Sequence, residues 1–135
     1  MNEQRIDNHM QHLDSLLEKV KRDDDVLAVL LFGSSVRMED LASSDVDICL
    51  LLRQKKFTPL FLSQKKMEYL QRFNFDIHIF QQLPIYIRVR VLREGKILYC
   101  RDEDELYTKA FRTIEEFDHF RPFYDEYLRQ VAHAG

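Results

Sequence analysis

Residues 31–52 read LFGSSVRMEDLASSDVDICLLL, and this stretch carries the strongest structural signal in the chain. One apolar run ends at a Gly33-Ser34 turn, and a second begins at Asp45 and Asp47, which a single apolar residue separates. Side chains two residues apart in a strand point to the same face. We therefore expect the two carboxylates side by side, where their repulsion makes a divalent cation the usual neutralising partner.

A third carboxylate lies in Phe75–Phe80, a segment in which apolar and polar residues alternate with period two. Asp76 falls on the polar face of this expected strand, together with His78. A strand placed beside the second apolar run would bring Asp76 next to Asp45 and Asp47, and three such carboxylates could hold two magnesium ions about 3.5–4 Å apart. His78 is interpreted as a surface or packed histidine, with metal binding or orientation of Asp76 as the alternative.

The Gly33-Ser34 turn predicts a phosphate-binding site if it leads into a helix, which we expect over Val36–Leu41, because backbone N–H groups at such a turn bind anions. Ser34 could contact the β- and γ-phosphates or cap this helix, and both roles can coexist. A phosphate cradle beside paired metal ligands indicates metal-assisted phosphoryl or nucleotidyl transfer.

The order of Gly33-Ser34, Asp45, Asp47 and Asp76 resembles the signature of the nucleotidyltransferase superfamily related to DNA polymerase beta. It is most similar to the minimal nucleotidyltransferases (MNT), small proteins that are often encoded beside a HEPN-domain protein. The resemblance covers roughly residues 26–127. Other matching positions are Arg37, Glu39, Ser44, Leu83-Pro84 and residues 93–99, whereas Met38 stands where the family often has glycine.

This resemblance implies a two-metal enzyme that transfers AMP from ATP to a hydroxyl and releases pyrophosphate. The acceptor would be a hydroxyl, most simply a tyrosine, of a partner HEPN ribonuclease toxin, which makes the protein a protein adenylyltransferase and an antitoxin. Two alternatives stay open: a non-catalytic antitoxin that masks its toxin by binding, and a stand-alone small-molecule nucleotidyltransferase. The implied catalytic residues and ligands of the two Mg²⁺ ions are Asp45, Asp47 and Asp76, and the implied ATP-binding residues are Gly33, Ser34 and Arg37.

The composition predicts one ordered domain over residues 1–135, with 45% apolar residues and a net charge of −3. This charge provides no overall basic field, so we expect no direct nucleic-acid partner. No apolar stretch approaches the roughly 20 residues that span a bilayer, and the first residues lack a signal-peptide pattern, so we expect no membrane and a cytoplasmic location. Cys49 and Cys100 are expected to be reduced thiols.

Alternating strand and helix signals predict an α/β (α+β) fold, a mixed β-sheet flanked by helices as in polymerase beta-like nucleotidyltransferases. The acidic run at residues 23–25 is expected to be a solvated turn. The expected helices are Glu3–Arg22, Pro59–Arg72, a helix from Pro84 that Gly95 ends, and a long stretch from Asp102; the expected strands are Val26–Phe32, Asp45–Leu52, Phe75–Phe80 and Lys96–Cys100.

The long C-terminal stretch is expected to break or kink at Pro122, with a final helix over Phe123–Val131. Phe111 and Phe123 fall outside the stripe that should face the core, and we expect them to contribute to a partner interface; the alternative is that the kink at Pro122 rotates Phe123 into the core. That core stripe contains Leu106, Ala110, Ile114, Phe117, Tyr124 and Leu128.

Overall fold

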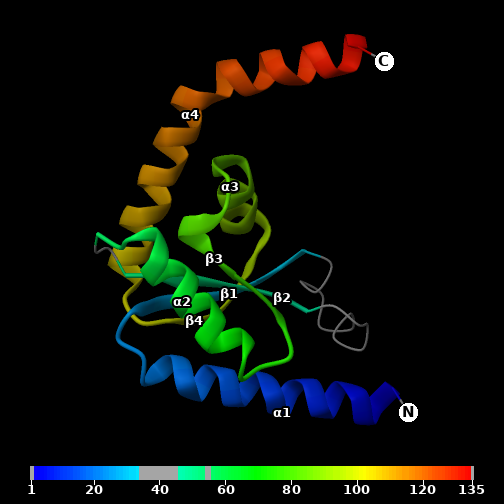
Figure 1. Ribbon diagram of the computed structural model, residues 1–135, viewed down its shortest axis with the longest axis vertical. Helices are drawn as coiled ribbons and strands as arrows, with labels where there is room; N and C mark the ends of the chain where they lie inside the picture. Colours follow the sequence, from blue (N-terminus) through cyan, green and yellow to red (C-terminus); the bar gives the residue numbers. More distant parts are fainter. Residues whose placement is uncertain (1, 34–45, 54–55, 135) are drawn as a thin grey trace.

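The computed structural model describes residues 2–33, 46–53 and 56–134 (Figure 1). Its mixed sheet has the strand order β3-β2-β1-β4, in which β2 and β3 are parallel and the other neighbours are antiparallel. The predicted α/β (α+β) class is confirmed. In chain order the elements are α1 (Asn2–Lys21), β1 (Val26–Phe32), β2 (Asp47–Leu52), α2 (Pro59–Leu70), β3 (Asp76–Ile79), the 3-10 turn η3 (Phe80–Gln82), α3 (Ile85–Glu94), β4 (Lys96–Cys100) and α4 (Glu103–Ala134).

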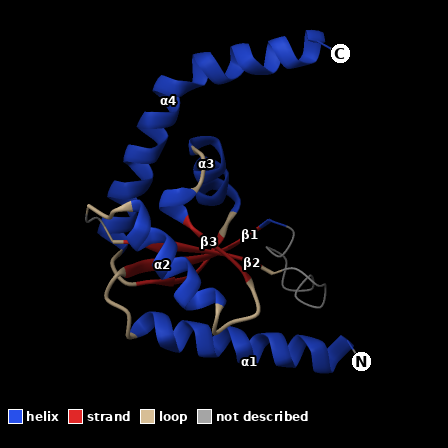
Figure 2. Cartoon of the chain, in the orientation of Figure 1, coloured by secondary structure: helices blue, strands red, loops and turns tan. Residues whose placement is uncertain are grey.

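β1 lies near the centre of the sheet, and helices cover both of its faces (Figure 2). Its sequence, VLAVLLF, is apolar throughout and buried except at its last residue, which is half-buried. A strand covered on both faces has no need for polar alternation. α1 and α2 supply Leu16 and Tyr69 to the core on one face, and α3 and α4 supply Val91 and Leu106 to the core on the other.

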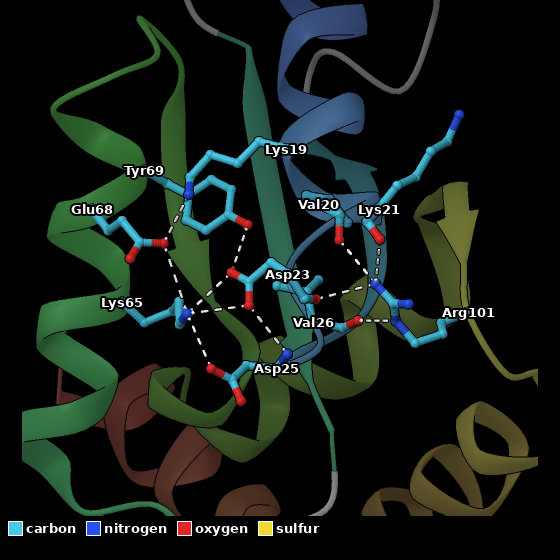
Figure 3. Close-up of polar contacts among 10 residues, drawn as sticks. All are labelled: Lys19, Val20, Lys21, Asp23, Asp25, Val26, Lys65, Glu68, Tyr69 and Arg101. Carbon is cyan, nitrogen blue, oxygen red and sulfur yellow. Dashed lines mark hydrogen bonds and ion pairs between the residues drawn. The ribbon is translucent and has the colours of Figure 1, made fainter.

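A network of polar side chains joins the start of β1 to α2 (Figure 3). Lys65 Nζ lies 3.0 Å from Asp23 Oδ2 and 3.2 Å from Asp25 Oδ2. Tyr69 Oη donates a hydrogen bond of 2.9 Å to Asp23 Oδ2. Burial raises the pKa of Asp23, but the hydrogen bonds from Lys65 and Tyr69 outweigh this and leave the pKa below its usual value.

The expectation of a solvated turn at residues 23–25 is wrong for Asp23, whose side chain is only 11% exposed. The cause is Lys65, which is 42 positions away in the sequence and itself only 9% exposed. A buried charge is tolerated when a buried opposite charge and hydrogen bonds accompany it.

Arg101 completes the same end of the sheet from the residue after β4 (Figure 3). Its guanidinium donates to the carbonyl oxygen of Val26 at 3.1 Å. It also donates to three carbonyl oxygens at the C-terminal end of α1 and in the turn that follows, those of Val20, Lys21 and Asp23, at 3.0–3.1 Å. The last carbonyls of a helix have no partner within the helix, so this side chain caps α1.

α4 is one helix with Pro122 inside it, so the expected separate final helix is wrong. The expected kink is confirmed, because Figure 1 shows α4 changing direction partway along and projecting away from the sheet. Proline removes one helical hydrogen bond but need not end the helix. The predicted core stripe extends too far: Leu106 is buried, whereas Ile114 and Leu128 are exposed, because the distal part of α4 leaves the sheet.

Element boundaries differ from expectation mainly at the ends of two strands. In the described residues β2 begins at Asp47, and β3 is shorter than the predicted Phe75–Phe80 because η3 takes over at its end. The helix expected over Val36–Leu41 lies outside the described residues. Within the described part of the chain, no helix is both long and apolar enough to cross a membrane.

Candidate active site

The site is built where two neighbouring parallel strands begin. Asp47 is the first residue of β2 and Asp76 the first of β3, and the strand register places them opposite each other. Cys49, two residues after Asp47, lies in the core that α3 and α4 cover, so the alternation of side chains puts Asp47 on that same face. The predicted pairing of these two carboxylates is therefore confirmed.

His78 lies beside both carboxylates because it follows Asp76 by two residues on β3. Its Nε2 is 3.2 Å from Asp76 Oδ1 and 3.8 Å from Asp47 Oδ1. Its ring packs edge-on against Phe32, with 5.4 Å between the ring centroids. The interpretation of His78 as a packed histidine is thus incomplete, since the geometry also matches the alternative in which it orients Asp76.

Asp76 and Asp47 differ in how far solvent reaches them. The Asp76 side chain is 57% exposed, whereas those of Asp47 and His78 are mostly covered. Burial raises the pKa of Asp76, but a hydrogen bond with Asp47 and the charge and hydrogen bond of His78 outweigh it, so the pKa lies below its usual value. Asp76 is therefore ionised near neutral pH, as a metal ligand must be.

Gly33 brings the backbone at the end of β1 against the Asp47 carboxylate. Its φ of +72° lies in the left-handed region that favours glycine. A Cβ atom at this position would lie 2.5 Å from Asp47 Oδ2, so a side chain would have to displace the carboxylate. Both the conformation and the close approach explain why the turn after this strand begins with glycine.

The donor atoms of the cluster suit a divalent cation. One ligand atom from each of Asp47, Asp76 and His78 lies within 4.8 Å of the other two. Carboxylate oxygens are the ligands that magnesium prefers, and an imidazole nitrogen is accepted more readily by transition metals. The two carboxylates therefore fit a magnesium ion. The sequence analysis gave His78 too little weight: its spacing of two residues from Asp76 on an expected strand already indicated that the two side chains share a face.

Of the residues predicted from the sequence, the structure brings together Gly33, Asp47 and Asp76. The other three, Ser34, Arg37 and Asp45, lie outside the described residues, and their roles stay predictions.

Comparison with known proteins gives a family match and a related protein. Residues 14–104 match the family described as Polymerase beta, Nucleotidyltransferase. The chain is also 31% identical over 97 residues to a protein of Methanocaldococcus jannaschii that is named, provisionally, as a protein adenylyltransferase. That match covers 67% of this chain and 74% of the relative.

Solved structures of toxin–antitoxin complexes contain chains with the same fold. One is the complex of a tri-AMPylated Shewanella oneidensis HEPN toxin with an MNT antitoxin, with a TM-score of 0.65, 15% identity, and coverage of 92% of this chain and 98% of that chain. Another is a toxin–antitoxin complex with AMP-PNP, with a TM-score of 0.62, 20% identity, and coverage of 86% and 95%. The family match and the shared fold agree, and the chain belongs to the polymerase beta nucleotidyltransferase family.

Proposed function

We propose that the protein transfers AMP from ATP to a hydroxyl, most simply a tyrosine, of a partner HEPN ribonuclease toxin, and acts as the cytoplasmic antitoxin. Three findings support this: the family match, the adenylyltransferase name of the Methanocaldococcus jannaschii relative, and the toxin–antitoxin complexes that share the fold. The observation that carries the proposal is the register of β2 and β3, which sets Asp47 beside Asp76 with Gly33 directly against Asp47.

The proposal assigns the metal ligands to three carboxylates. Asp47 and Asp76 have the geometry described above, and Asp45 joins them through the sequence pattern. Two magnesium ions, when bound, would stabilise the charge on the phosphates and lower the pKa of the attacking hydroxyl. Like charges repel, so a bound cation would lower the free energy of holding these carboxylates close together.

The transfer is a substitution at the α-phosphorus of ATP. The acceptor oxygen forms the new bond, the bond between the α-phosphorus and the oxygen bridging to the β-phosphate breaks, and pyrophosphate leaves. Asp76, the more exposed carboxylate, helps to accept the proton of the acceptor hydroxyl. His78 holds Oδ1 of Asp76 and so fixes the direction of its other oxygen.

The leaving phosphates are assigned to the turn after β1. Gly33 has no side chain to block an approach to its backbone, and the N–H groups of Gly33 and Ser34 would hold the phosphates. Arg37 would add a positive charge in the same place. Neither Ser34 nor Arg37 lies in the described residues, so both enter through the sequence pattern.

The partner interface is assigned to α4. Phe111 and Phe123 are 65% and 74% exposed, as expected from their position outside the core stripe. Exposed aromatic side chains are frequent anchors of protein interfaces. Their location on a helix that projects away from the sheet would leave the carboxylates open to a macromolecular acceptor.

The direct test is incubation with labelled ATP, magnesium and the product of the neighbouring gene, followed by intact mass measurement. Wild type should add AMP to the partner, and Asp47→Asn should not, whereas the matched surface variant Asp104→Asn should behave as wild type. If Asp47→Asn protects cells from the toxin as well as wild type does at equal expression, the protein is a binding antitoxin. Transfer to small molecules but not to the neighbouring product would indicate a stand-alone enzyme.

A further inference from the structure

A hydrogen bond joins α1 to the segment that leads into β3. The backbone N–H of Asn74 donates to His12 Nε2 at 2.8 Å, across 62 positions of the sequence. His12 is half-buried, and its ring lies against two buried aromatic side chains of the same segment. The distance between ring centroids is 5.4 Å to Phe73 and 5.0 Å to Phe75. His12 therefore fastens α1 to the entry of β3.

The entry of β3 has few other restraints, because this strand is short and lies at the edge of the sheet. Its four residues stand at one end of the strand order, where β2 is the neighbouring strand. At its start, the N–H of Asp76 donates to the carbonyl oxygen of Val46 at 2.9 Å. Strand ends with few contacts open most easily. The bond from Asn74 to His12 therefore restrains the backbone directly before Asp76.

His12 acts on Asp76 through the backbone and not through the carboxylate. Phe75, which the His12 ring contacts, belongs to the core that α1 and α2 cover. Because side chains alternate along a strand, Asp76 points to the opposite face, where Asp47 and His78 lie. The Asp76 carboxylate is mostly exposed, so its direction depends strongly on the backbone that carries it. His12 and His78 thus restrain Asp76 from opposite faces of the sheet.

The hydrogen bond also defines the state of the His12 ring. A nitrogen that accepts a hydrogen bond carries no proton, and a neutral imidazole has one such nitrogen. The contact with Asn74 therefore requires the neutral ring with its proton on Nδ1. Glutamine can offer a carbonyl oxygen as the acceptor, whereas phenylalanine keeps a ring for packing but has no acceptor. These two substitutions separate hydrogen bonding from packing.

We propose that His12 is a positioning residue for the Asp76 carboxylate. Its Nε2 holds the backbone of Asn74 and thereby sets the direction in which β3 presents Asp76 to the metal. The inference rests on the proposed function, in which Asp76 is a metal ligand. Without the acceptor, the start of β3 is free to shift relative to Asp47, and the two carboxylates bind a cation less tightly.

The first test follows the hydrogen bond itself, by nuclear magnetic resonance of the full-length protein at about pH 8, where an ordinary histidine is neutral. The ring nitrogen shifts of wild type should place the His12 proton on Nδ1. In His12→Phe the amide proton of Asn74 should shift upfield and exchange faster with water, and in His12→Gln it should stay close to wild type. An Asn74 amide that His12→Phe leaves unchanged would overturn the proposal.

The second test measures binding of manganese with AMP-PNP by electron paramagnetic resonance. His12→Phe should weaken it by about three- to tenfold, the effect of one net hydrogen bond, and His12→Gln should restore most of the affinity. Ser15→Ala is the matched control, because it removes only a bond of 3.2 Å within α1, and it should change nothing. If His12→Phe does not fold, His12→Asn, whose amide is one methylene shorter than that of glutamine, takes its place with the same expected loss.

Two results would overturn the positioning role. One is equal manganese affinity in wild type and in the variant without an acceptor, with or without a change in melting temperature. The other is a loss of affinity in His12→Gln although its Asn74 amide keeps the wild-type shift. Failure of wild type to bind manganese with AMP-PNP would instead contradict the proposed function, and His12 would then serve only the fold.

Discussion

Acidic side chains lie near both ends of β1, but the side chains that surround them differ. Where the strand begins, the half-buried Asp23 accepts hydrogen bonds from Lys65 and Tyr69. Where the strand ends, Asp47 and Asp76 converge on His78, a side chain that carries charge only when it is protonated. At the first end the partner is Lys65, which is charged at neutral pH, whereas at the second end the described partner of both carboxylates is a histidine.

The difference separates stability from function. A buried acid with a fixed lysine partner contributes to holding α1, β1 and α2 together, and removing one partner is costly. Two carboxylates placed side by side at the start of neighbouring strands are an arrangement that proteins often retain where a ligand or a reaction requires it. The comparison therefore predicts that substitutions at the first end reduce stability and that substitutions at the second end reduce activity.

The largest expected effect is on stability, from Lys65→Met. This change leaves the Asp23 carboxylate, whose side chain is only 11% exposed, without its cation, and breaking such an ion pair from one side costs up to about 3–5 kcal/mol of unfolding free energy. Chemical denaturation followed by circular dichroism measures it. The double variant Lys65→Met with Asp23→Asn should recover much of the loss, because the neutral amide still accepts the hydrogen bond from Tyr69. Equal stability of wild type and Lys65→Met would show that the ion pair between Lys65 and Asp23 does not stabilise the fold.

Asp47→Asn should produce the largest effect on activity. Loss of one metal ligand should lower AMP transfer by at least about a hundredfold, since the metal supplies several kcal/mol of transition-state stabilisation. The melting temperature without metal should stay level or rise, because a crowded negative charge has been removed. Transfer is followed by label incorporation, and melting by calorimetry. A marked drop in melting temperature would show that Asp47 serves the fold as Asp23 does.

The sequence predicted the carboxylate pair of Asp47 and Asp76 better than the ion pair of Asp23 and Lys65. Asp47 was identifiable because it stands at the start of an apolar run, and Asp76 because it lies on the polar face of an alternating segment; the regular alternation of strands fixes their common face. Asp23, Lys65 and Arg101 belong to separate elements, and their contacts depend on how helices pack, which local patterns do not encode. The same limit explains the core stripe of α4, since a heptad-like pattern cannot show where a helix leaves the sheet.

The contacts among Asp23, Lys65 and Tyr69 also predict how the stability of the fold depends on pH. Burial lowers the pKa of Lys65, but its bonds to Asp23 outweigh this and raise it overall; burial and the charge of Asp23 both raise the pKa of Tyr69. Groups whose pKa is raised by folding stabilise fully below their unfolded pKa of about 10, and this contribution is lost as the pH rises through the folded value. Urea midpoints of wild type should therefore fall above about pH 10.

The control for this pH dependence is Lys65→Met, in which the contribution of the lysine to the alkaline loss is absent. Asp23 has the opposite sign: its lowered pKa gives stability that is present above about pH 4 and is lost as the pH falls through the folded value. The wild-type stability should thus be level between these limits. Alkaline curves of the same shape for wild type and Lys65→Met would assign the loss to other groups.

The smallest expected effect is on metal binding and comes from substitution of His78. It tests whether His78 positions the Asp76 carboxylate. Asp76 is largely exposed at the start of a strand, so packing alone holds its carboxylate weakly, and the contact of 3.2 Å from His78 Nε2 supplies the missing constraint. We expect His78→Leu, which keeps an apolar contact with Phe32, to weaken binding of manganese with AMP-PNP by about three- to tenfold, equivalent to roughly 1 kcal/mol, the net value of one such hydrogen bond.

His78→Gln is the matched control, because its side-chain amide places an N–H donor near the position of Nε2 and should restore most of the affinity. Electron paramagnetic resonance of bound manganese measures this without any transfer reaction. Rescue by glutamine assigns His78 to positioning Asp76, whereas equal loss in both variants would make the imidazole itself a metal ligand. A fall in melting temperature in His78→Leu with unchanged manganese affinity would instead mean that His78 stabilises the fold. Residues near both ends of β1 would then serve stability.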